Sequence, residues 1–236
     1  GYYSGIIEIQ SERYTVARTR LYGCIGLLGA LPEGLQETLE RECSFLLTQA
    51  TVCRYLQTSD NRIDLPDTLW SRPVLDDPAA KLNYEELQTF IAAGRDLFPS
   101  AVLIRQENDP SEKTPSRWTV AAKNVGVFDL LSGLGARASF SMKWDTADLE
   151  KTRAVSVRLL NKSPDGAAEI IAGSAGLMAS VRNGVPTIIN PESIMSRDEQ
   201  RKLYAAESLL LLNRFVVLYT KDNAAASAYF AMGIVH

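Results

Sequence analysis

Carboxylates are the only catalytic groups that this chain offers in number, with 28 Asp and Glu residues among 236. Asp145, Asp148 and Glu150 cluster directly after Trp144. Carboxylates at such spacing can divide the acid and base roles of glycoside hydrolysis, or bind Mg²⁺ through their oxygens. The same residues are favoured in turns and in the first turn of a helix, and we expect this simpler role here. A carboxylate-based, Mg²⁺-dependent enzyme acting on nucleic acid or sugar is therefore the alternative interpretation.

Histidine chemistry has little support, because the only histidine is His236, the last residue. Chain termini fray unless they are held, so a catalytic or metal-binding imidazole is not expected there. The segment Gly173-Ser174-Ala175-Gly176 resembles a nucleophile elbow, but Ala172 stands where the motif requires glycine. We therefore predict a turn serine, no catalytic residue and no cofactor.

The three cysteines do not form a recognisable framework. Cys43 and Cys53 fall in one predicted helix, where ten residues separate their Cα atoms by about 15 Å, beyond disulfide reach. A bridge to Cys24 stays open, but three buried free thiols are the favoured interpretation. Their spacing does not fit a zinc site either, so no metal is expected. This usage indicates the cytoplasm, another reducing compartment or a virion, and no signal peptide is seen.

One stretch suggests nucleic-acid recognition. Residues 13–25 alternate as a strand would, placing arginines between aromatic rings on one face, and a later predicted strand could extend this surface. Cations of this kind meet phosphates while the rings stack on bases. A solvated strand face, or arginines packed against acidic loops, is the favoured alternative. The residues assigned to this candidate surface are Tyr14, Arg18, Arg20, Tyr22, Lys143 and Trp144.

Glycine-rich phosphate binding is not supported. Gly133-Leu134-Gly135 lacks a third glycine, and the residues after it are predicted to form a strand rather than the helix that a dinucleotide loop should open. We predict a turn between two strands at this place.

The elements that position these residues predict a single α+β domain over 1–236, with helices packed on a largely antiparallel sheet. Apolar spacing and capping residues predict helices at about 33–57, 83–98 and 197–212. The strands are predicted at 5–9, 13–25, 101–106, 117–123, 137–144, 153–160, 168–172, 177–182, 185–189 and 215–219. Asn183-Gly184 is a strong hairpin signal. A Pro- and Asp-rich arm or loop is predicted at about 58–82, and residues 223–235 fit helix and strand equally.

The near-balanced composition, with 25 basic against 28 acidic residues, argues against wholesale nucleic-acid binding. No apolar run is long enough to span a membrane. Together with the missing catalytic motifs, this predicts a non-catalytic structural subunit of a coat, nucleocapsid or scaffold assembly. Its expected partners are copies of itself or other subunits, and single-stranded nucleic acid. Tyr229–Gly233 is similar to a short aromatic-Ala-Met-Gly segment of nucleocapsid proteins of negative-strand RNA viruses; five residues imply nothing further.

Overall fold

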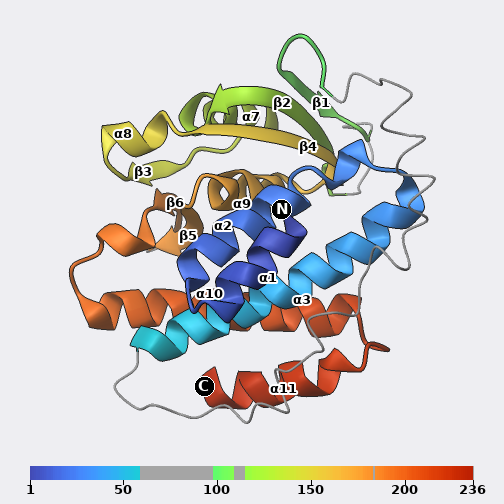
Figure 1. Cartoon of the computed structure of the whole chain (residues 1–236). Helices are drawn as coiled ribbons and strands as arrows, with labels where there is room; N and C mark the ends of the chain where they lie inside the picture. The colour runs from blue at the N-terminus through green and yellow to red at the C-terminus, as the bar shows by residue number, and fades with distance from the viewer. Residues whose placement is uncertain (59–97, 109–114, 183, 236) are drawn as a thin grey trace.

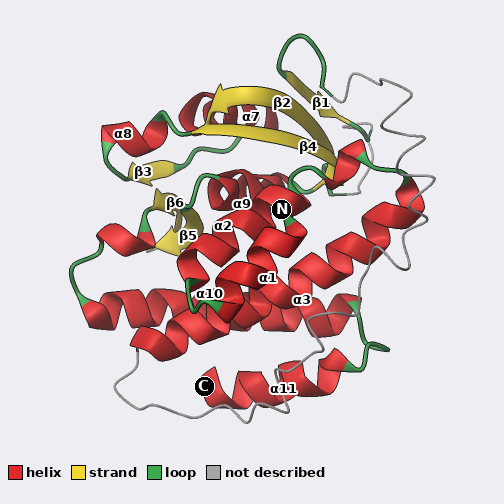
Figure 2. Cartoon of the chain, viewed as in Figure 1, coloured by secondary structure: helices red, strands yellow, loops and turns green. Residues whose placement is uncertain are grey.

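The protein combines a stack of helices with two small sheets, which confirms the α+β prediction (Figure 1, Figure 2). The computed structural model describes residues 1–58, 98–108, 115–182 and 184–235. The helices within these ranges are α1 (Tyr2–Gln10), α2 (Tyr14–Ile25), η1 (Leu28–Ala30), α3 (Glu33–Thr58), α7 (Val127–Ala138), α8 (Asp148–Lys151), α9 (Pro164–Ser174), η2 (Pro191–Ser193), α10 (Arg197–Leu218) and α11 (Ala224–Val235). The strands are β1 (Leu103–Gln106), β2 (Trp118–Gly126), β3 (Lys143–Asp145), β4 (Ala154–Lys162), β5 (Met178–Arg182) and β6 (Val185–Ile189).

The first sheet has the order β1-β2-β4 and is antiparallel throughout. Val120 on β2 faces Leu159 on β4, and both are buried against helices α7 and α9. In Figure 1 this sheet lies at the top, with α9 between it and α2. The strands predicted at 101–106, 117–123 and 153–160 are confirmed here.

The second sheet, β3-β6-β5, includes the predicted hairpin. Gly184 has a φ of +76°, which its lack of a side chain permits in this tight turn. Met178 and Ile189 pair on one face, while Ala179 and Ile188 pair on the other. Strand β3 joins β6 in parallel.

Two apolar clusters meet at this second sheet. The first contains Ile188 with side chains of α1, α2, the first sheet, α7 and α9. The second contains Met178 and Ile189 with side chains of α10 and α11. Helix α3 contributes to both, through Leu46 in the first and Phe45 in the second. The helix and the small sheet therefore form the common wall between the clusters.

The strong helix signals are also confirmed. The helix predicted at 33–57 is α3, and the one predicted from 197 is α10. The Ser196 hydroxyl accepts a hydrogen bond from the Glu199 amide at 3.3 Å, which closes the first turn of α10. This helix continues to Leu218, so the strand predicted at 215–219 is wrong. Residues 224–235 resolve as helix α11.

Four further strand predictions are corrected. The segments 5–9, 13–25 and 168–172 lie within helices α1, α2 and α9. Short apolar runs fit either structure, and α9 is decided by its start, where Ser163 caps the helix and Pro164 occupies its first position. Residues 137 and 138 end α7, and Ser139 turns the chain with a φ of +58°. Of the predicted strand 137–144, only residues 143 and 144 pair, as part of β3.

Some predictions fall outside the described residues. The arm or loop at about 58–82 and the helix at 83–98 lie almost entirely within 59–97, and His236 is also outside. Within the described ranges, none of the helices has both the length and the apolar composition required to cross a membrane.

Candidate functional site

The residues predicted to form a nucleic-acid-binding strand face lie on a helix instead. In α2, residues four apart share a side, so Tyr14, Arg18 and Tyr22 lie together while Arg20 points elsewhere. Arg18 and Tyr22 are only 3% and 2% exposed, whereas Arg20 is exposed. The prediction that these side chains share one exposed face is therefore wrong, because the helical period buries two of them.

The other two members of that predicted surface are on a separate element. Lys143 and Trp144 lie in β3, whose sheet partner is β6. Lys143 is exposed, but Trp144 is half-buried and packs on Phe128, with ring centroids 5.1 Å apart. The structure thus uses the indole in packing against α7.

Arg18 instead forms a buried ion pair at the centre of the molecule. Its Nη2 donates to both carboxylate oxygens of Glu207 on α10, at 2.5 and 2.6 Å. Its Nε donates to the Thr51 hydroxyl on α3 at 3.2 Å. The two charged side chains are 4% and 9% exposed. Three helices are therefore joined by charge-assisted hydrogen bonds in a region of low dielectric.

Two tyrosines flank this pair. The Arg18 guanidinium lies 5.9 Å from the ring centre of Tyr22 and 5.3 Å from that of Tyr204, which allows cation–π attraction to both. The Tyr22 hydroxyl lies 3.1 Å from a carboxylate oxygen of Glu207 and 3.1 Å from one of Glu169. Since a phenol has one hydrogen, it can donate fully to only one of these two carboxylates at a time.

On the α9 side, the contacts reach the surface through a second ion pair. Arg214 of α10 donates through two nitrogens to the two oxygens of Glu169, at 3.0 and 2.8 Å. The Arg214 side chain is 43% exposed, whereas that of Glu169 is 12% exposed. This pair therefore connects the buried centre to solvent.

On the side of η2, Glu192 is the carboxylate that corresponds to Glu169. It accepts from Arg54 at 3.2 and 2.8 Å and from the Tyr204 hydroxyl at 2.6 Å. The Thr15 hydroxyl adds a fourth hydrogen bond at 3.1 Å. We call the whole set the buried charge network, which consists of Arg18, Tyr22, Arg54, Glu169, Glu192, Tyr204, Glu207 and Arg214.

The electrostatics of this network are balanced, with three guanidiniums facing three carboxylates. Burial raises the pKa of Glu207, against the opposing effect of Arg18, and the nearby Glu169 raises it further. Burial alone would lower the pKa of Arg18, but Glu207 more than compensates, so this pKa is raised and the guanidinium stays charged. Burial also raises the pKa of Tyr22 and Tyr204, which keeps both phenols protonated donors at neutral pH.

The cleft beside the network is small. It lies between α2, α3, α9 and α10, is lined by Tyr22, Glu169 and Arg214 among others, and has a volume of about 70 Å³. Pockets for ordinary small-molecule ligands measure roughly 300–1,000 Å³. A water molecule needs only about 10–15 Å³ in this measure, so the cleft has room for a few waters.

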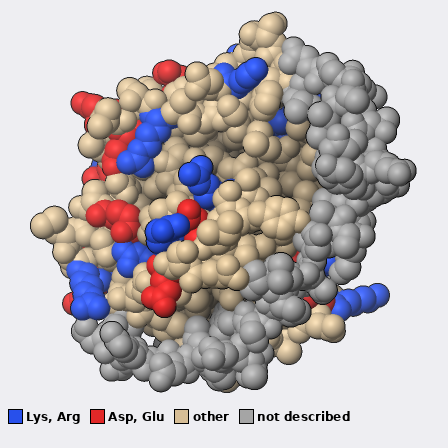
Figure 3. All heavy atoms as spheres, viewed as in Figure 1, with Lys and Arg blue, Asp and Glu red and all other residues tan. Residues whose placement is uncertain are grey.

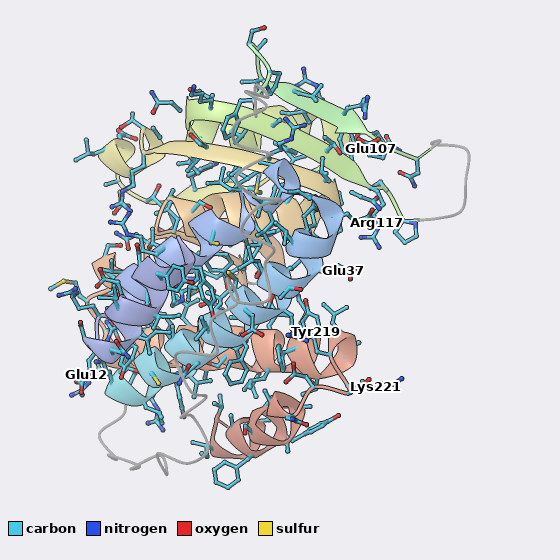
Figure 4. The ribbon with its side chains drawn as sticks, turned by 45° about the vertical axis from the view of Figure 1, so that its right-hand side comes forward. Glu12, Glu37, Glu107, Arg117, Tyr219 and Lys221 are labelled. Carbon is cyan, nitrogen blue, oxygen red and sulfur yellow. The ribbon has the colours of Figure 1, made fainter. Side chains whose placement is uncertain are left out.

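A second, shallower hollow of about 350 Å³ adjoins this cleft, and the two share Glu40 and Tyr219. Glu37 lines it from α3 and Tyr219 from just beyond the end of α10, and Figure 4 shows the two on the same side of the molecule. Arg41 also lines it, so charges of both signs face this hollow.

The acidic cluster proposed for the alternative enzyme is engaged within the fold. Asp145 pairs with Arg182 at 3.1 Å, and Asp148 pairs with Lys151 at 2.8 Å. Glu150 is buried, accepts from the Ala147 amide at 3.1 Å, and is also bonded by Arg153 and Asn190. The predicted helical turn is confirmed as α8, and Glu150 ties it to the start of η2.

The remaining motifs also have structural roles. The Ser174 hydroxyl donates to the Ile170 carbonyl at 2.7 Å, within the last turn of α9. Gly133 and Gly135 lie inside α7, so the turn predicted there is wrong. A Cβ on Gly135 would lie 2.7 Å from the Phe140 carbonyl oxygen, which explains glycine at that position. Across the described ranges, His, Cys, Asp and Glu side chains do not gather in threes as a metal ion would require.

Most of the buried charge network was missed by sequence reasoning. One signal was available for Glu207, which lies four residues from both Leu203 and Leu211 on the buried side of α10. A carboxylate at such a position requires a cationic partner. Nothing local in the sequence identifies Glu169 or Arg54 as its neighbours.

Comparison with protein-family models, with curated proteins and with solved structures finds no match to this chain.

Proposed function

We propose that the protein is a non-catalytic subunit of a larger assembly, acting through contacts with copies of itself. The observation that carries this proposal is a set of large apolar side chains held in solvent by anchored elements. Met195 is 99% exposed, Leu149 82% and Val181 70%. Contiguous exposed apolar surface marks sites of contact with other proteins, and the proposal takes these three side chains to belong to one such surface.

The elements that bear these side chains are fixed to the rest of the fold. Leu149 lies in α8, and Glu150 of this helix bonds Asn190 at the start of η2. Met195 follows η2, and in Figure 1 α8 and the connection from η2 to α10 lie along the same side, at the left. Val181 lies in the hairpin, whose Arg182 pairs with Asp145 of β3. Rigid presentation reduces the entropy lost when such a surface binds a partner.

The distribution of surface charge favours contact with another protein over long-range electrostatic attraction of a strongly charged ligand. Acidic and basic side chains lie beside one another on the face shown in Figure 3. The chain as a whole has a formal charge of only -3. Because Arg18 and Tyr22 are buried, the surface first considered for single-stranded nucleic acid is no longer part of the proposal.

The test is the molecular mass in solution, measured by light scattering over a wide range of protein concentration. We expect the wild type to associate as concentration rises, and Met195→Glu combined with Leu149→Glu to weaken this association at least tenfold. Ile7→Glu is the matched control, since Ile7 is an apolar side chain that is 56% exposed on α1. A wild type that stays monomeric at every concentration would exclude the proposal. Equal loss of association in the Ile7 variant would exclude this surface.

A further inference from the structure

The second sheet ends in an edge strand, β5. The strand order is β3-β6-β5, which Figure 1 shows from top to bottom at the left. Exposure rises along β5 towards the hairpin, since Met178 is buried whereas Val181 is 70% exposed. In the part of the chain that the structure describes, β6 is the only strand that pairs with β5, so the outer edge of β5 is open to a further strand.

Pro186 determines which backbone groups of β5 point outward. Antiparallel pairs alternate between those that exchange N–H···O=C bonds and those that do not. Val181 pairs with Pro186, which has no N–H to donate, so this pair is one without hydrogen bonds. Ser180 and Arg182, on either side of Val181, therefore bond to β6. The N–H and C=O groups of Val181 and Ala179 point outward, away from β6.

The edge of β5 has few of the features that discourage pairing with another chain. Natural edge strands are protected by charged residues, proline or bulges. β5 contains neither proline nor lysine, its pairing with β6 is regular, and its one charge, Arg182, is paired with Asp145 of the same sheet at 3.1 Å. The opposite edge strand, β3, differs in each respect that matters, because it has only three residues and two of them, Lys143 and Asp145, are exposed charges.

We propose that β5 pairs in antiparallel orientation with β5 of a second copy of this chain, which joins the two small sheets into one continuous sheet. A two-fold axis at Ser180 sets Ala179 of each copy opposite Val181 of the other. Both residues turn their N–H and C=O groups outward, so each of these pairs exchanges two hydrogen bonds. A shift of register to either side would set one of the two residues opposite a position outside β5. The inference rests on the proposed self-association and names the edge through which two copies meet.

The side chains and charges are compatible with this register. Val181 and Ala179 lie on the same face of the sheet, so the exposed Val181 of each copy packs on the small Ala179 of the other and extends the first apolar cluster. On the opposite face the two Ser180 side chains meet, in a pair whose Cα atoms are about 4.5 Å apart. Arg182 lies two residues from the axis. The two guanidiniums are therefore at opposite ends of the new pairing, and like charges do not face each other.

The test is disulfide cross-linking of cysteine variants of the full chain under mild oxidation, followed by non-reducing gels and peptide maps. Ser180→Cys should form a covalent dimer linked through position 180, at concentrations where light scattering shows the wild type to be associated. Val181→Cys should cross-link at least tenfold more slowly, because its Cα atoms lie diagonally, about 7–8 Å apart, at the limit of disulfide reach. An equimolar mixture of Ala179→Cys and Val181→Cys should form the mixed dimer. The wild type, whose three cysteines are all free in the structure, is the control for background cross-linking.

Val181→Pro tests the backbone hydrogen bonds directly. It removes an N–H that points outward and leaves the pairing with β6 intact, as proline does on edge strands. We expect this variant to weaken association at least tenfold. Val181→Thr is the matched control, since it keeps both the N–H and the branched side chain, and it should associate nearly as tightly as the wild type. Thermal unfolding shows whether both variants keep the fold, and if Val181→Pro does not, the cysteine variants still decide the question.

Three outcomes would overturn the edge pairing while the proposed self-association stands. They are a wild type that associates although Ser180→Cys forms no covalent dimer, faster cross-linking through position 181 than through position 180, and unchanged association in a folded Val181→Pro. A wild type that stays monomeric would overturn both proposals. If Met195→Glu combined with Leu149→Glu leaves association intact while Ser180→Cys still cross-links, the surface assigned to those two residues is wrong and the edge pairing is confirmed.

Discussion

The buried pair of Arg18 and Glu207 makes the sharpest prediction, because removing one partner leaves the other charge in the core. Glu207→Gln keeps the size of the side chain but turns an amide towards Nη2 of Arg18, where carboxylate oxygens now accept at 2.5 and 2.6 Å. Loss of one member of a buried ion pair costs about 3–5 kcal/mol. For a chain of 236 residues, each kcal/mol lowers Tm by roughly 2–4 °C. We therefore expect Glu207→Gln to lower Tm by about 6–20 °C.

The assay is equilibrium unfolding in urea together with thermal unfolding, for wild type, Glu207→Gln, Glu207→Leu, Arg18→Met and the double variant Arg18→Met/Glu207→Leu, so that the last three variants and the wild type close the cycle. The double variant removes both charges and replaces them with apolar side chains of similar length. Replacing both members of a buried pair is often neutral or stabilising. We expect the double variant to be more stable than either single variant, which is a coupling that a double-mutant cycle measures directly. Asp148→Asn, which removes an exposed ion pair, is the control and should leave the midpoint unchanged.

Two results would refute this reasoning. One is a loss of less than about 1 kcal/mol in Glu207→Gln, which is the range of exposed pairs. The other is a double variant whose loss equals the sum of the two single losses, because that would mean that Arg18 and Glu207 contribute independently.

Further expected outcomes concern Glu192 and two glycines. Burial alone would raise the pKa of Glu192, but hydrogen bonds from Arg54 and other donors hold this pKa below 4.5. The stability that the Glu192 carboxylate contributes is therefore present above pH 4.5 and is lost as pH falls further. Glu192→Gln should flatten the acid limb of a curve of stability against pH. An unchanged acid limb would contradict this. Gly173→Ala should destabilise the protein by at least about 1–3 kcal/mol in urea unfolding, because a Cβ there would lie 2.2 Å from the ring of Tyr22. Gly34→Ala, an exposed helical glycine with open space around it, should instead stabilise by about 0.5–1 kcal/mol, and a loss of stability in both variants would show that packing at Gly173 is not the cause.

The parts of the fold that could be predicted are those with a strong local signal. Helix α3 has a long apolar stripe, α10 has the Ser196 cap, and the β5–β6 hairpin has Asn183-Gly184. Each of these signals acts within a few residues, so the sequence alone identifies it. The short apolar segment 168–172 has no periodicity of its own, and the cap formed by Ser163 and Pro164 ahead of it decides that it is a helix.

Helix α2 shows why the candidate site was misplaced. Tyr14, Arg18 and Tyr22 are spaced by four residues, and four is both an even number and close to one helical turn. The three residues therefore share a face in a strand and in a helix alike. Arg20 and Val16 distinguish the two structures, since the helix turns them away from the others and leaves both exposed. The four-residue spacing correctly predicts that the three residues share a face, but it does not indicate whether a strand or a helix forms that face.

The pairing of Arg18 with Glu207 is not visible in the local sequence, because the two residues are 189 residues apart. The local sequence pattern does not indicate that Arg18 and Glu207 pair, whereas the free-energy cost of burying an unpaired charge does. Glu207 lies between Leu203 and Leu211 on a buried helical face, and Arg18 lies between the buried Ala17 and Leu21. Once both helices are recognised, each charge requires an opposite one in the core, and these two satisfy that need for each other. Correct assignment of α2 as a helix is therefore the step from which the pairing of α2 with α10 would have followed.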